Sequence, residues 1–519
     1  MNAMTRRGAR IAALLTGAAL AVSLTACAAD DSVTGEEGSE THDLIVGAMG
    51  GPASLDPAML YEGQSAYVWS AVYDTLLAKN PETGEIEGNA AESWEYSEDG
   101  LTLTLKIREG MTFSSGDPVD AEAVAASMNR TRTTPGTQQS RFAMVSDVVA
   151  VDDSTVEVQF TEFDPAFLET LFNATGVIGD PATVEDEATA TDPVGSGPYT
   201  LSDETVAGTA YVLEKRDEYW NADAFPFDTI TVKVFADPTA QINALQAGEI
   251  YAATVNPQMI APFEADAETF SFQTVTGATI AELVILDRTG ERIPALGDER
   301  VRQAINMAID REGMVSSLMP DTGAATNQLF GPTGNAYIEE LDSYFDYDVE
   351  AAKELMADAG YADGFTLPIP STYLSTRFEP LLSDQLSEIG ITVEWVPTPP
   401  NEMDGINFSG KYGATIAFGS FTGGDPGILE QNFGSGQNNP SGYTDDVIDA
   451  AMEEIHGSID QDAAAEAYRT LNQHVVEIGL TAPFARIDTI WVLRDGVAYL
   501  DSGASTMNEI RVFGLAESD

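Results

Sequence analysis

A helix, a glycine and a strand follow one another without a connecting loop between residues 379 and 395. Residues 379–389 have a helical pattern, Gly390 ends it, and apolar residues alternate with polar ones from Ile391 to Trp395. Glycine adopts the left-handed conformation of a helix end without strain, and alternation with a period of two is typical of a strand. A chain that joins helices to strands in this way is predicted to fold as an α/β protein.

The rest of the chain contains the same two kinds of pattern. Strands are predicted at residues 44–48 and 101–107, and a hairpin is predicted over residues 149–160. A helix over residues 239–247 is expected to end at Gly248. Further helices are predicted over residues 120–131, 299–309, 349–359, 444–456 and 462–478. A chain of this length buries cores of its own, and we expect more than one domain.

The N-terminus has the three parts of a secretory signal peptide. Arginines between residues 6 and 10 form a positive head, residues 11–22 are apolar, and Leu24-Thr25-Ala26-Cys27 follows. The apolar stretch is shorter than the roughly 20 residues that span a bilayer. The last four residues resemble the bacterial lipobox, in which the cysteine receives a diacylglycerol after cleavage. We therefore expect a signal peptide at residues 1–26 and lipidation of Cys27; the alternative is a secreted protein with a cysteine here by chance.

A polar segment separates Cys27 from the body of the chain. Residues 27–42 are rich in Asp, Glu, Ser, Gly and Thr and have no apolar period, so we expect a lipidated flexible linker. The body is expected at the outer face of the cell membrane, held there by the lipid on Cys27. Because Cys27 is the only cysteine, an intramolecular disulfide is excluded.

The chain is strongly acidic, with 84 acidic and 24 basic residues and a formal net charge of −60. Such a surface repels nucleic acids and anionic lipid head groups, which excludes both as electrostatic partners. We interpret the acidity as a solvated surface, and cation binding is the alternative. The three histidines, His42, His456 and His474, do not have metal-site spacing. Neither a metal site nor a cofactor is predicted.

The most specific motif lies between residues 94 and 124. Trp94 is followed by Asp99-Gly100-Leu101-Thr102-Leu103-Thr104-Leu105, by IREGMTF at residues 107–113 and by GDPVDAEAV at residues 116–124. The other motifs are Ser54-Leu55-Asp56-Pro57, PVGSGPY at 193–199, ALQAGEI at 244–250, DERVRQAINMAIDR at 298–311 and residues 347–361. In this order the motifs resemble the family 5 extracellular solute-binding proteins of the peptide/nickel type, which serve ABC importers.

The resemblance implies a two-lobed fold like that of periplasmic binding proteins (class II, cluster C type), with an extra subdomain and a hinge. Domain I is then expected in residues 43–75, 189–282 and 483–519. The extra subdomain of domain II is expected in residues 76–188, and domain III, the second lobe, in residues 283–482. The ligand is expected to lie between the lobes, which close around it by a hinge motion.

The first candidate for ligand contact is the loop of Tyr61, Glu62, Gly63 and Gln64, which follows the Leu55-Asp56-Pro57 turn. In the family this stretch offers backbone groups that pair with an extended ligand, so the resemblance implies the same role here. The alternative is an ordinary surface loop.

The second candidate is the glycine-rich loop from Phe418 to Pro426. Peptide-binding members of the family often carry Trp-x-x-Asp-Tyr-x-x-Pro here, and the Asp pairs with the ammonium group of the peptide. Alignment on Pro426 places Gly419 at the Trp and Thr422 at the Asp. A desolvated ammonium needs a charged partner, so Asp425 is the candidate replacement, or alternatively a turn former. The candidate contacts in this loop are Ser420, Phe421, Thr422 and Asp425.

Two later segments complete the candidate site. Residues 438–443 resemble the cleft-edge loop of the family, with Asn439 and Tyr443 as candidate contacts. Residues 483–486 match the point where the chain returns to domain I. Phe484 is a candidate for stacking on a ligand, and Arg486 for holding a carboxylate or phosphate. The alternative for Arg486 is a salt bridge with one of the many acidic residues.

Together these features predict a monomeric protein, not an enzyme, that captures a small solute and delivers it to an ABC transporter permease. A di- or oligopeptide is the first candidate, and the missing Asp leaves a metal chelate, a sugar or an opine-like compound as alternatives. A lipid-anchored hydrolase is less favoured, since the sequence has no Gly-x-Ser-x-Gly or His-Glu-x-x-His motif. A sensor that presents bound ligand to a receptor is a further alternative that the sequence does not distinguish from import.

Overall fold

The structure is a computed structural model. The residues that it describes are 42–81, 83–256, 259–320, 322–372, 375–398, 406, 410–420, 424–434, 436, 438–500 and 509–516. The predicted signal peptide, the linker up to residue 41, Cys27, Phe421 and Thr422 lie outside the described residues.

A nine-stranded sheet joins segments from both ends and the middle of the chain, in the order β16-β12-β17-β11-β1-β10-β9-β8, with β13 paired to β17. β1 runs parallel to β10 and β11, and the other neighbours are antiparallel. The strand predicted at residues 44–48 is confirmed as β1. The strands are β1 (Asp43–Ala48), β8 (Tyr199–Leu201), β9 (Ala210–Lys215), β10 (Thr229–Val234), β11 (Ala252–Thr254), β12 (Phe270–Ile285), β13 (Gly323–Ala325), β16 (Ala414–Ser420) and β17 (Pro483–Arg494).

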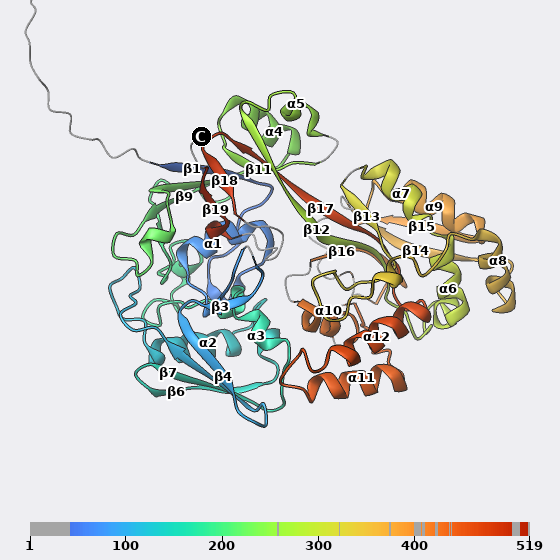
Figure 1. The fold of residues 1–519 in the computed structure, drawn as a ribbon, viewed down its shortest axis with the longest axis horizontal. Coiled ribbons are helices and arrows are strands. Elements are labelled where there is room, and N and C mark those ends of the chain that lie inside the picture. Colours follow the sequence, from blue (N-terminus) through green and yellow to red (C-terminus); the bar gives the residue numbers. More distant parts are fainter. Residues whose placement is uncertain are drawn as a thin grey trace, which may run out of the picture. The chain divides into compact units, whose positions relative to one another are not determined.

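Two long strands connect the two parts of this sheet. β12 has 16 residues and β17 has 12, and they pair from Phe270 with Arg494 to Glu282 with Pro483. They extend together from β11 to β16 (Figure 1). Separate apolar cores lie on the two sides of a shift in their pairing between Val275 and Thr279. We call residues 42–275 and 488–516 the first lobe and residues 279–487 the second lobe.

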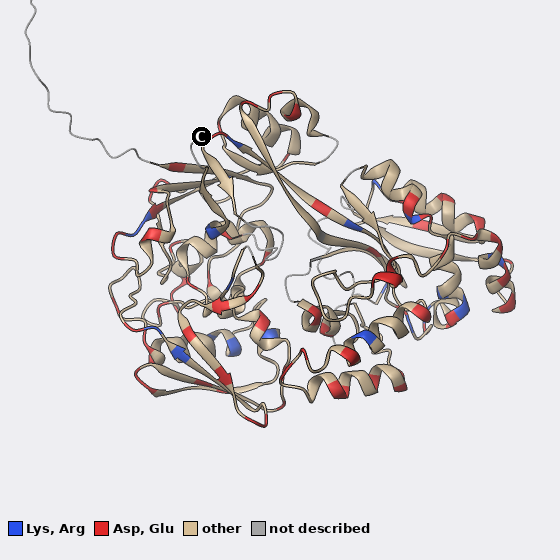
Figure 2. Ribbon diagram, in the orientation of Figure 1, with Lys and Arg blue, Asp and Glu red and all other residues tan. Residues whose placement is uncertain are grey.

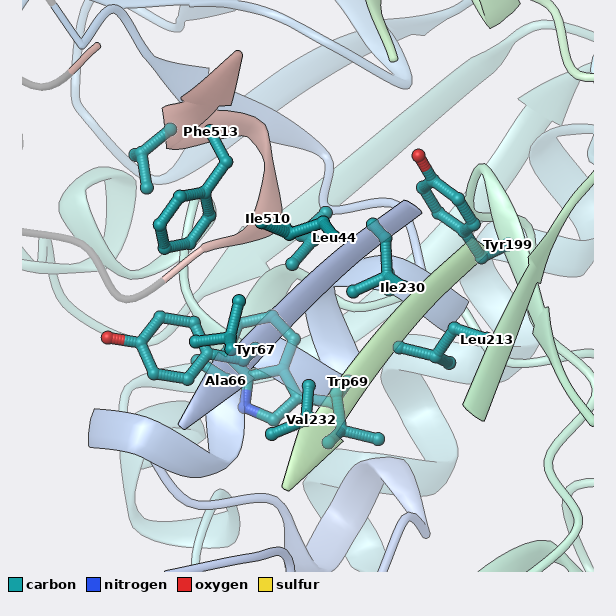
Figure 3. Packing of buried hydrophobic residues seen from close by; sticks show 14 of the residues in the cluster. Leu44, Ala66, Tyr67, Trp69, Tyr199, Leu213, Ile230, Val232, Ile510 and Phe513 are labelled. Carbon is teal, nitrogen blue, oxygen red and sulfur yellow. The ribbon is translucent and has the colours of Figure 1, made fainter. Parts of the chain in front are cut away.

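The main core of the first lobe forms around α1 (Ala66–Val72), whose seven residues are all buried. Figure 3 shows Tyr67 and Trp69 of this helix packed with Leu44 of β1. Ile510 and Phe513, from the C-terminal end of the chain, close the same core, and the rings of Tyr67 and Phe513 lie 6.1 Å apart. The last strands, β18 (Val497–Tyr499) and β19 (Phe513–Leu515), pair beside it. The end of the chain therefore belongs to the first lobe.

A second sheet in the first lobe has four antiparallel strands in the order β4-β5-β7-β6, covered by α2. Leu103, Leu105 and Ile107 point into its core, and Asp120 caps α2 by accepting from the Ala123 amide at 2.9 Å. The predicted strand at 101–107, the hairpin and the helix are confirmed. The elements are β2 (Leu77–Lys79), β3 (Ile86–Gly88), β4 (Ala91–Tyr96), β5 (Thr102–Ile107), α2 (Ala121–Thr133), β6 (Val145–Asp152), β7 (Thr155–Phe160) and α3 (Phe167–Thr170).

The second lobe contains the helix–glycine–strand unit. β14 and β15 pair in parallel, and Leu382 and Leu386 of α9 pack into the core with Ile391 of β15. A further core holds α10, α11 and α12 together. The elements are α6 (Glu299–Ala308), α7 (Arg311–Leu318), α8 (Val349–Asp358), β14 (Phe365–Ser371), α9 (Glu379–Glu388), β15 (Ile391–Pro397), α10 (Gly424–Asn432), α11 (Asp446–His456) and α12 (Ala465–Glu477).

The predicted helices of both lobes are confirmed, with small differences at their ends. α4 (Pro238–Ala247) ends at Gly248, which has a φ of 76°, and α5 (Ala261–Glu264) follows it. α12 begins at Ala465 rather than at residue 462. The aspartates before α6, α8 and α11 accept hydrogen bonds from amides of the first turn, which explains where these helices begin.

A buried carboxyl group in β12 gives a prediction about stability. Glu282 is 3% exposed, and burial raises its pKa from 4.5 to about 7, while Arg288 opposes the shift. Since the folded state holds this proton more tightly than the unfolded state, the contribution is most favourable below pH 4.5 and is lost as pH rises towards 7. Glu282→Gln is therefore expected to gain stability relative to the parent between about pH 5 and about pH 8, as measured by urea unfolding.

The matched control is Glu394→Gln, at an exposed position of β15. Its difference from the parent is expected to be the same at both pH values. An equal pH dependence of unfolding in Glu282→Gln and in the parent would contradict the assignment.

Candidate functional site

A cavity of about 560 Å³ lies between the two lobes. The first lobe lines it with Lys79, Tyr96 and Glu169, and the second lobe with Asp425 and Tyr468, while Gly277 of β12 lies at the junction. Gly277 has a φ of 63°, a conformation that glycine adopts readily. The cavity therefore borders the point at which β12 passes from one lobe to the other.

Asp425, in the first turn of α10, forms part of the second-lobe wall. It is 8% exposed, and its Oδ2 accepts a hydrogen bond from the Ala336 amide at 2.8 Å. A Cβ at Gly334 would lie 2.1 Å from Oδ1, so the carboxylate needs a glycine there. Burial raises the pKa of Asp425 to about 6. The carboxyl group both holds the loop at residues 331–336 and lines the cavity.

Glu169, from α3, lies on the first-lobe wall. Its Oε2 is buried and has no hydrogen-bond partner in the part of the chain that the structure describes. Burial raises the pKa of Glu169, the Lys79 ammonium lowers it, and the charge of Asp425 on the other lobe raises it. The Lys79 ammonium lies 5.1 Å from the centre of the Phe172 ring. Two carboxyl groups from opposite lobes thus interact across the cavity, with one ammonium beside them.

The loop at residues 61–64 does not contribute to the wall that the described residues form around this cavity. Tyr61 is 53% exposed, and Gly63 has a φ of 77°. Gln64 accepts from the Met49 amide at 2.5 Å and donates to Thr254 Oγ1 at 3.2 Å, so its side chain ties the ends of β1 and β11 together. The role of this loop as a ligand contact stays a prediction.

Glu62 of the same loop is exposed as a residue, but its carboxyl group is held by a hydrogen bond. Its Oε1 accepts from the Ala174 amide at 3.0 Å. Surrounding protein atoms desolvate the carboxyl group and raise its pKa to about 7, although the residue as a whole remains exposed. Glu62 therefore carries a proton at a higher pH than an ordinary surface glutamate.

The predicted ligand contacts of Asn439 and Tyr443 stay predictions, and the structure shows what their side chains bond to within the protein. The Asn439 amide group donates to Phe433 O, Gly434 O and Tyr443 O at 3.0–3.3 Å and accepts from the Tyr443 amide at 2.9 Å. The Tyr443 ring lies under the Arg302 guanidinium, at 5.6 Å. The Asn439 side chain holds its own loop, because a buried amide needs its hydrogen bonds, whereas the Tyr443 ring packs against Arg302 of α6. Ser420 is the last residue of β16 and pairs with Thr279 of β12.

Stacking of Phe484 on a ligand likewise stays a prediction. Phe484 is fully buried and packs against Phe378 at 5.1 Å. Arg486 is 7% exposed and binds Asp342 through both nitrogens, at 3.0 and 2.5 Å. The salt bridge that was the alternative for Arg486 is therefore present and uses both terminal nitrogens of its guanidinium.

Sequence patterns indicated Asp425 but not Glu169 or Lys79, the other charged residues described above for the cavity wall. Glu169 lies in a helix of four residues, and no motif surrounds it or Lys79. Arg377, outside the cavity wall, was not predicted either. Its guanidinium lies 4.6 Å from the Phe378 ring and 6.0 Å from the Phe418 ring. Among the described residues no carboxylate forms a salt bridge with Arg377, and desolvation lowers its pKa.

The described residues also bear on membrane-spanning segments and metal sites. Within the described residues, no helix combines the length and the hydropathy that crossing a membrane requires. The same residues contain no group of three or more His, Cys, Asp or Glu side chains placed to hold a metal ion.

Comparison with known proteins establishes the family. Residues 85–441 match the family model described as bacterial extracellular solute-binding proteins, family 5, middle region. The chain belongs to family 5. Members of this family are extracytoplasmic solute-binding proteins of ABC importers, which points to a binding protein and away from an enzyme.

Relatives of this family 5 protein differ in the ligands for which they are named. Heme-binding protein A of Haemophilus influenzae is 26% identical, and the match covers 89% of this chain and 91% of the relative. The glutathione-binding protein GsiB of Shigella boydii is 27% identical, with 68% and 69% covered. The solved structure of Helicobacter pylori DppA with the peptide STSA is 21% identical, covers 92% of this chain and 98% of that chain, and gives a TM-score of 0.79. The likeness confirms the predicted α/β fold of a periplasmic binding protein.

Proposed function

We propose that this family 5 protein is a lipid-anchored, extracytoplasmic binding protein that captures a di- or oligopeptide between its lobes and delivers it to an ABC transporter permease. One observation carries the proposal: each lobe contributes a carboxyl group to one cavity, and the two carboxyl groups interact. A cation between Glu169 and Asp425 would relieve their repulsion and contact both lobes at once. The ammonium group of a peptide is such a cation.

The Oε2 atom of Glu169 can accept a hydrogen bond from this ammonium, since no described residue donates one to it. A buried carboxylate oxygen without a partner loses the hydrogen bonds that water would give it, and a bound donor restores one of them. Asp425 keeps its bond to the Ala336 amide through Oδ2 and lines the cavity beside Gly424. It is the nearest acidic residue after Thr422, where peptide-binding members carry their Asp.

Arg377 is the candidate for the other end of a peptide. Its guanidinium lies on Phe378 and Phe418, and Phe418 belongs to β16, the strand that precedes α10. A guanidinium binds a carboxylate through two parallel hydrogen bonds. A non-peptide solute, such as a metal chelate, a sugar or an opine-like compound, is the second candidate, favoured by the replacement of the expected Asp by Thr422 and by the heme-binding relative.

Calorimetry with a peptide panel tests the proposal. Peptides with a free N-terminus are expected to bind, and Glu169→Gln and Asp425→Asn are each expected to weaken binding by about 10- to 100-fold, the range of a lost charged hydrogen bond. Both substitutions preserve the size of the side chain, and the carboxamide oxygen introduced by Asp425→Asn can still accept from the Ala336 amide.

Two controls define the result. Asp384→Asn, at an exposed position of α9 outside the cavity, is expected to leave affinity unchanged. Peptides with an acetylated N-terminus are expected to bind at least about 10-fold more weakly. Equal affinity for free and acetylated peptides would refute the ammonium anchor, and binding of non-peptide solutes alone would refute the peptide assignment.

A further inference from the structure

A second group of charges lies where the lobes meet, outside the cavity wall. His456, at the end of α11, and Glu430, on α10, form a short ion pair with 2.6 Å between Nε2 and Oε1. Both residues belong to the second lobe, and both are partly exposed. A pair between neighbouring helices of one lobe would by itself say nothing about the other lobe.

The first lobe brings two more carboxyl groups to this pair. Glu162 and Asp164 lie between β7 and α3, and α3 contacts α10 (Figure 1). Phe163 and Pro165, their neighbours in sequence, line the cavity opposite Ile459, three residues after His456. His456 interacts electrostatically with Glu430, Asp164 and Glu162. The imidazole therefore contacts Glu430 of its own lobe and lies within the electrostatic reach of two carboxyl groups of the first lobe.

These carboxyl groups repel one another when the lobes are together. The charge of Glu430 raises the pKa of Asp164, and His456 lowers it, in addition to the larger effect of burial. Asp and Glu are spread over both lobes with few Lys or Arg among them (Figure 2). When protonated, His456 is a cation that offsets this repulsion.

We propose that protonated His456 is a positioning residue for lobe closure: its imidazolium bridges Glu430 of the second lobe to Asp164 and Glu162 of the first. The inference rests on the proposed function, in which the lobes close around a solute. Below the ordinary pKa of histidine the bridge is complete, and it is lost as pH rises through the raised pKa of His456. Closure, and with it solute retention, is therefore favoured in mildly acidic surroundings.

Other groups at the contact titrate in the same direction. Burial raises the pKa values of Glu169 and Asp425 across the cavity, and protonation of either carboxyl group also reduces repulsion between the lobes. Tyr468 of α12, which interacts with Glu430, donates to Gln461 and stays neutral in this range. The contribution of His456 is therefore measured by comparing variants at one pH, not from the pH profile of the parent alone.

Single-molecule fluorescence transfer between the lobes tests the proposal without any solute. Dyes are attached at Glu98→Cys in the first lobe and Glu354→Cys in the second, both exposed, in the mature chain carrying Cys27→Ser. At about pH 6 the closed population of His456→Gln is expected to be about threefold smaller than that of the parent, the ratio that a partly exposed ion pair supports. At about pH 8.5 the two populations are expected to be equal.

The matched control is His474→Gln. His474 pairs with Asp445 at 2.8 Å within the second lobe, so its replacement is expected to leave the closed population unchanged at both pH values. Asp164→Asn added to His456→Gln is expected to restore closure at about pH 6, because it removes the charge that the imidazolium offsets. A merely structural role for His456 would not give this rescue.

Two results would overturn the inference. One is an equal closed population in His456→Gln and the parent at about pH 6; the other is an equal loss in His474→Gln. Neither result would contradict solute capture, because peptide binding is measured separately by calorimetry. Conversely, if no peptide in the panel binds, the proposed function is refuted, while the closed populations still test the role of His456 at the contact between the lobes.

Discussion

Replacing Arg311 by methionine is expected to lower the free energy of unfolding by about 2–4 kcal/mol, because several buried acceptors lose their donor at once. Arg311 is 5% exposed, and its guanidinium donates to the carbonyls of Asn306, Thr326 and Pro483 and to the Asn306 side chain, at 2.6–3.1 Å. These acceptors belong to α6, to the segment after β13 and to β17. Methionine fills a similar volume but leaves the acceptors without donors, and buried acceptors without donors are costly.

Urea unfolding of Arg311→Met measures this loss, with Arg300→Met as the control. The Arg300 side chain is 46% exposed and pairs with Asp298 at 2.6 Å, so its loss is expected to cost about 1 kcal/mol or less. Arg311→Lys keeps the positive charge but not the planar guanidinium, so its loss of unfolding free energy is expected to lie between those of Arg311→Met and Arg300→Met. A change in Arg311→Met no larger than that in Arg300→Met would contradict the role of Arg311 as a buried hub.

Replacing Cys27 by serine is expected to transfer nearly all of the protein from the membrane fraction to the soluble fraction. The reason is that a chain with a net charge of −60 is repelled by anionic lipid head groups, so acyl chains on Cys27 are the proposed attachment. Each buried methylene contributes about 0.8 kcal/mol, and two chains suffice for stable anchoring. Fractionation followed by immunoblotting measures the change.

The released Cys27→Ser protein is expected to fold and to bind solute as the parent does, because the anchor raises the concentration near the permease without contributing to the ligand site. Cys27→Ser protein that stays with the membrane would contradict the anchor. Loss of solute binding on release would contradict the separation of anchor and site.

Much of the fold was predictable because local patterns agreed with the tertiary structure. β5 alternates buried and exposed residues, and Gly248 and Gly390 end helices with φ values of 76° and 84°. The long strands β12 and β17 were not predicted. Their residues cross from one lobe to the other, so that the buried face changes along the strand and no single period persists. Pairing between residues 270–285 and 483–494 is also too distant in sequence for a local pattern to reveal.

The candidate site followed from the sequence only in part, for physical reasons that differ from residue to residue. Asn439 and Phe484 stay predicted contacts. In the structure the Asn439 amide group bonds within its own loop, and the Phe484 ring lies in the core of the second lobe. Glu169 was missed because its significance depends on Asp425, which lies on the other lobe and is brought near only by the fold. Asp425 itself was predicted and lines the cavity.

Mass spectrometry identifies the small molecules that the purified protein releases when it is denatured. We expect the parent to release a peptide with a free N-terminus in a near one-to-one ratio. The double variant Glu169→Gln/Asp425→Asn, purified in the same way, is expected to release little or none of it. A parent that releases no small solute, or a double variant that releases the same peptide in the same amount, would contradict the claim that the carboxyl groups of the two lobes hold a peptide between them.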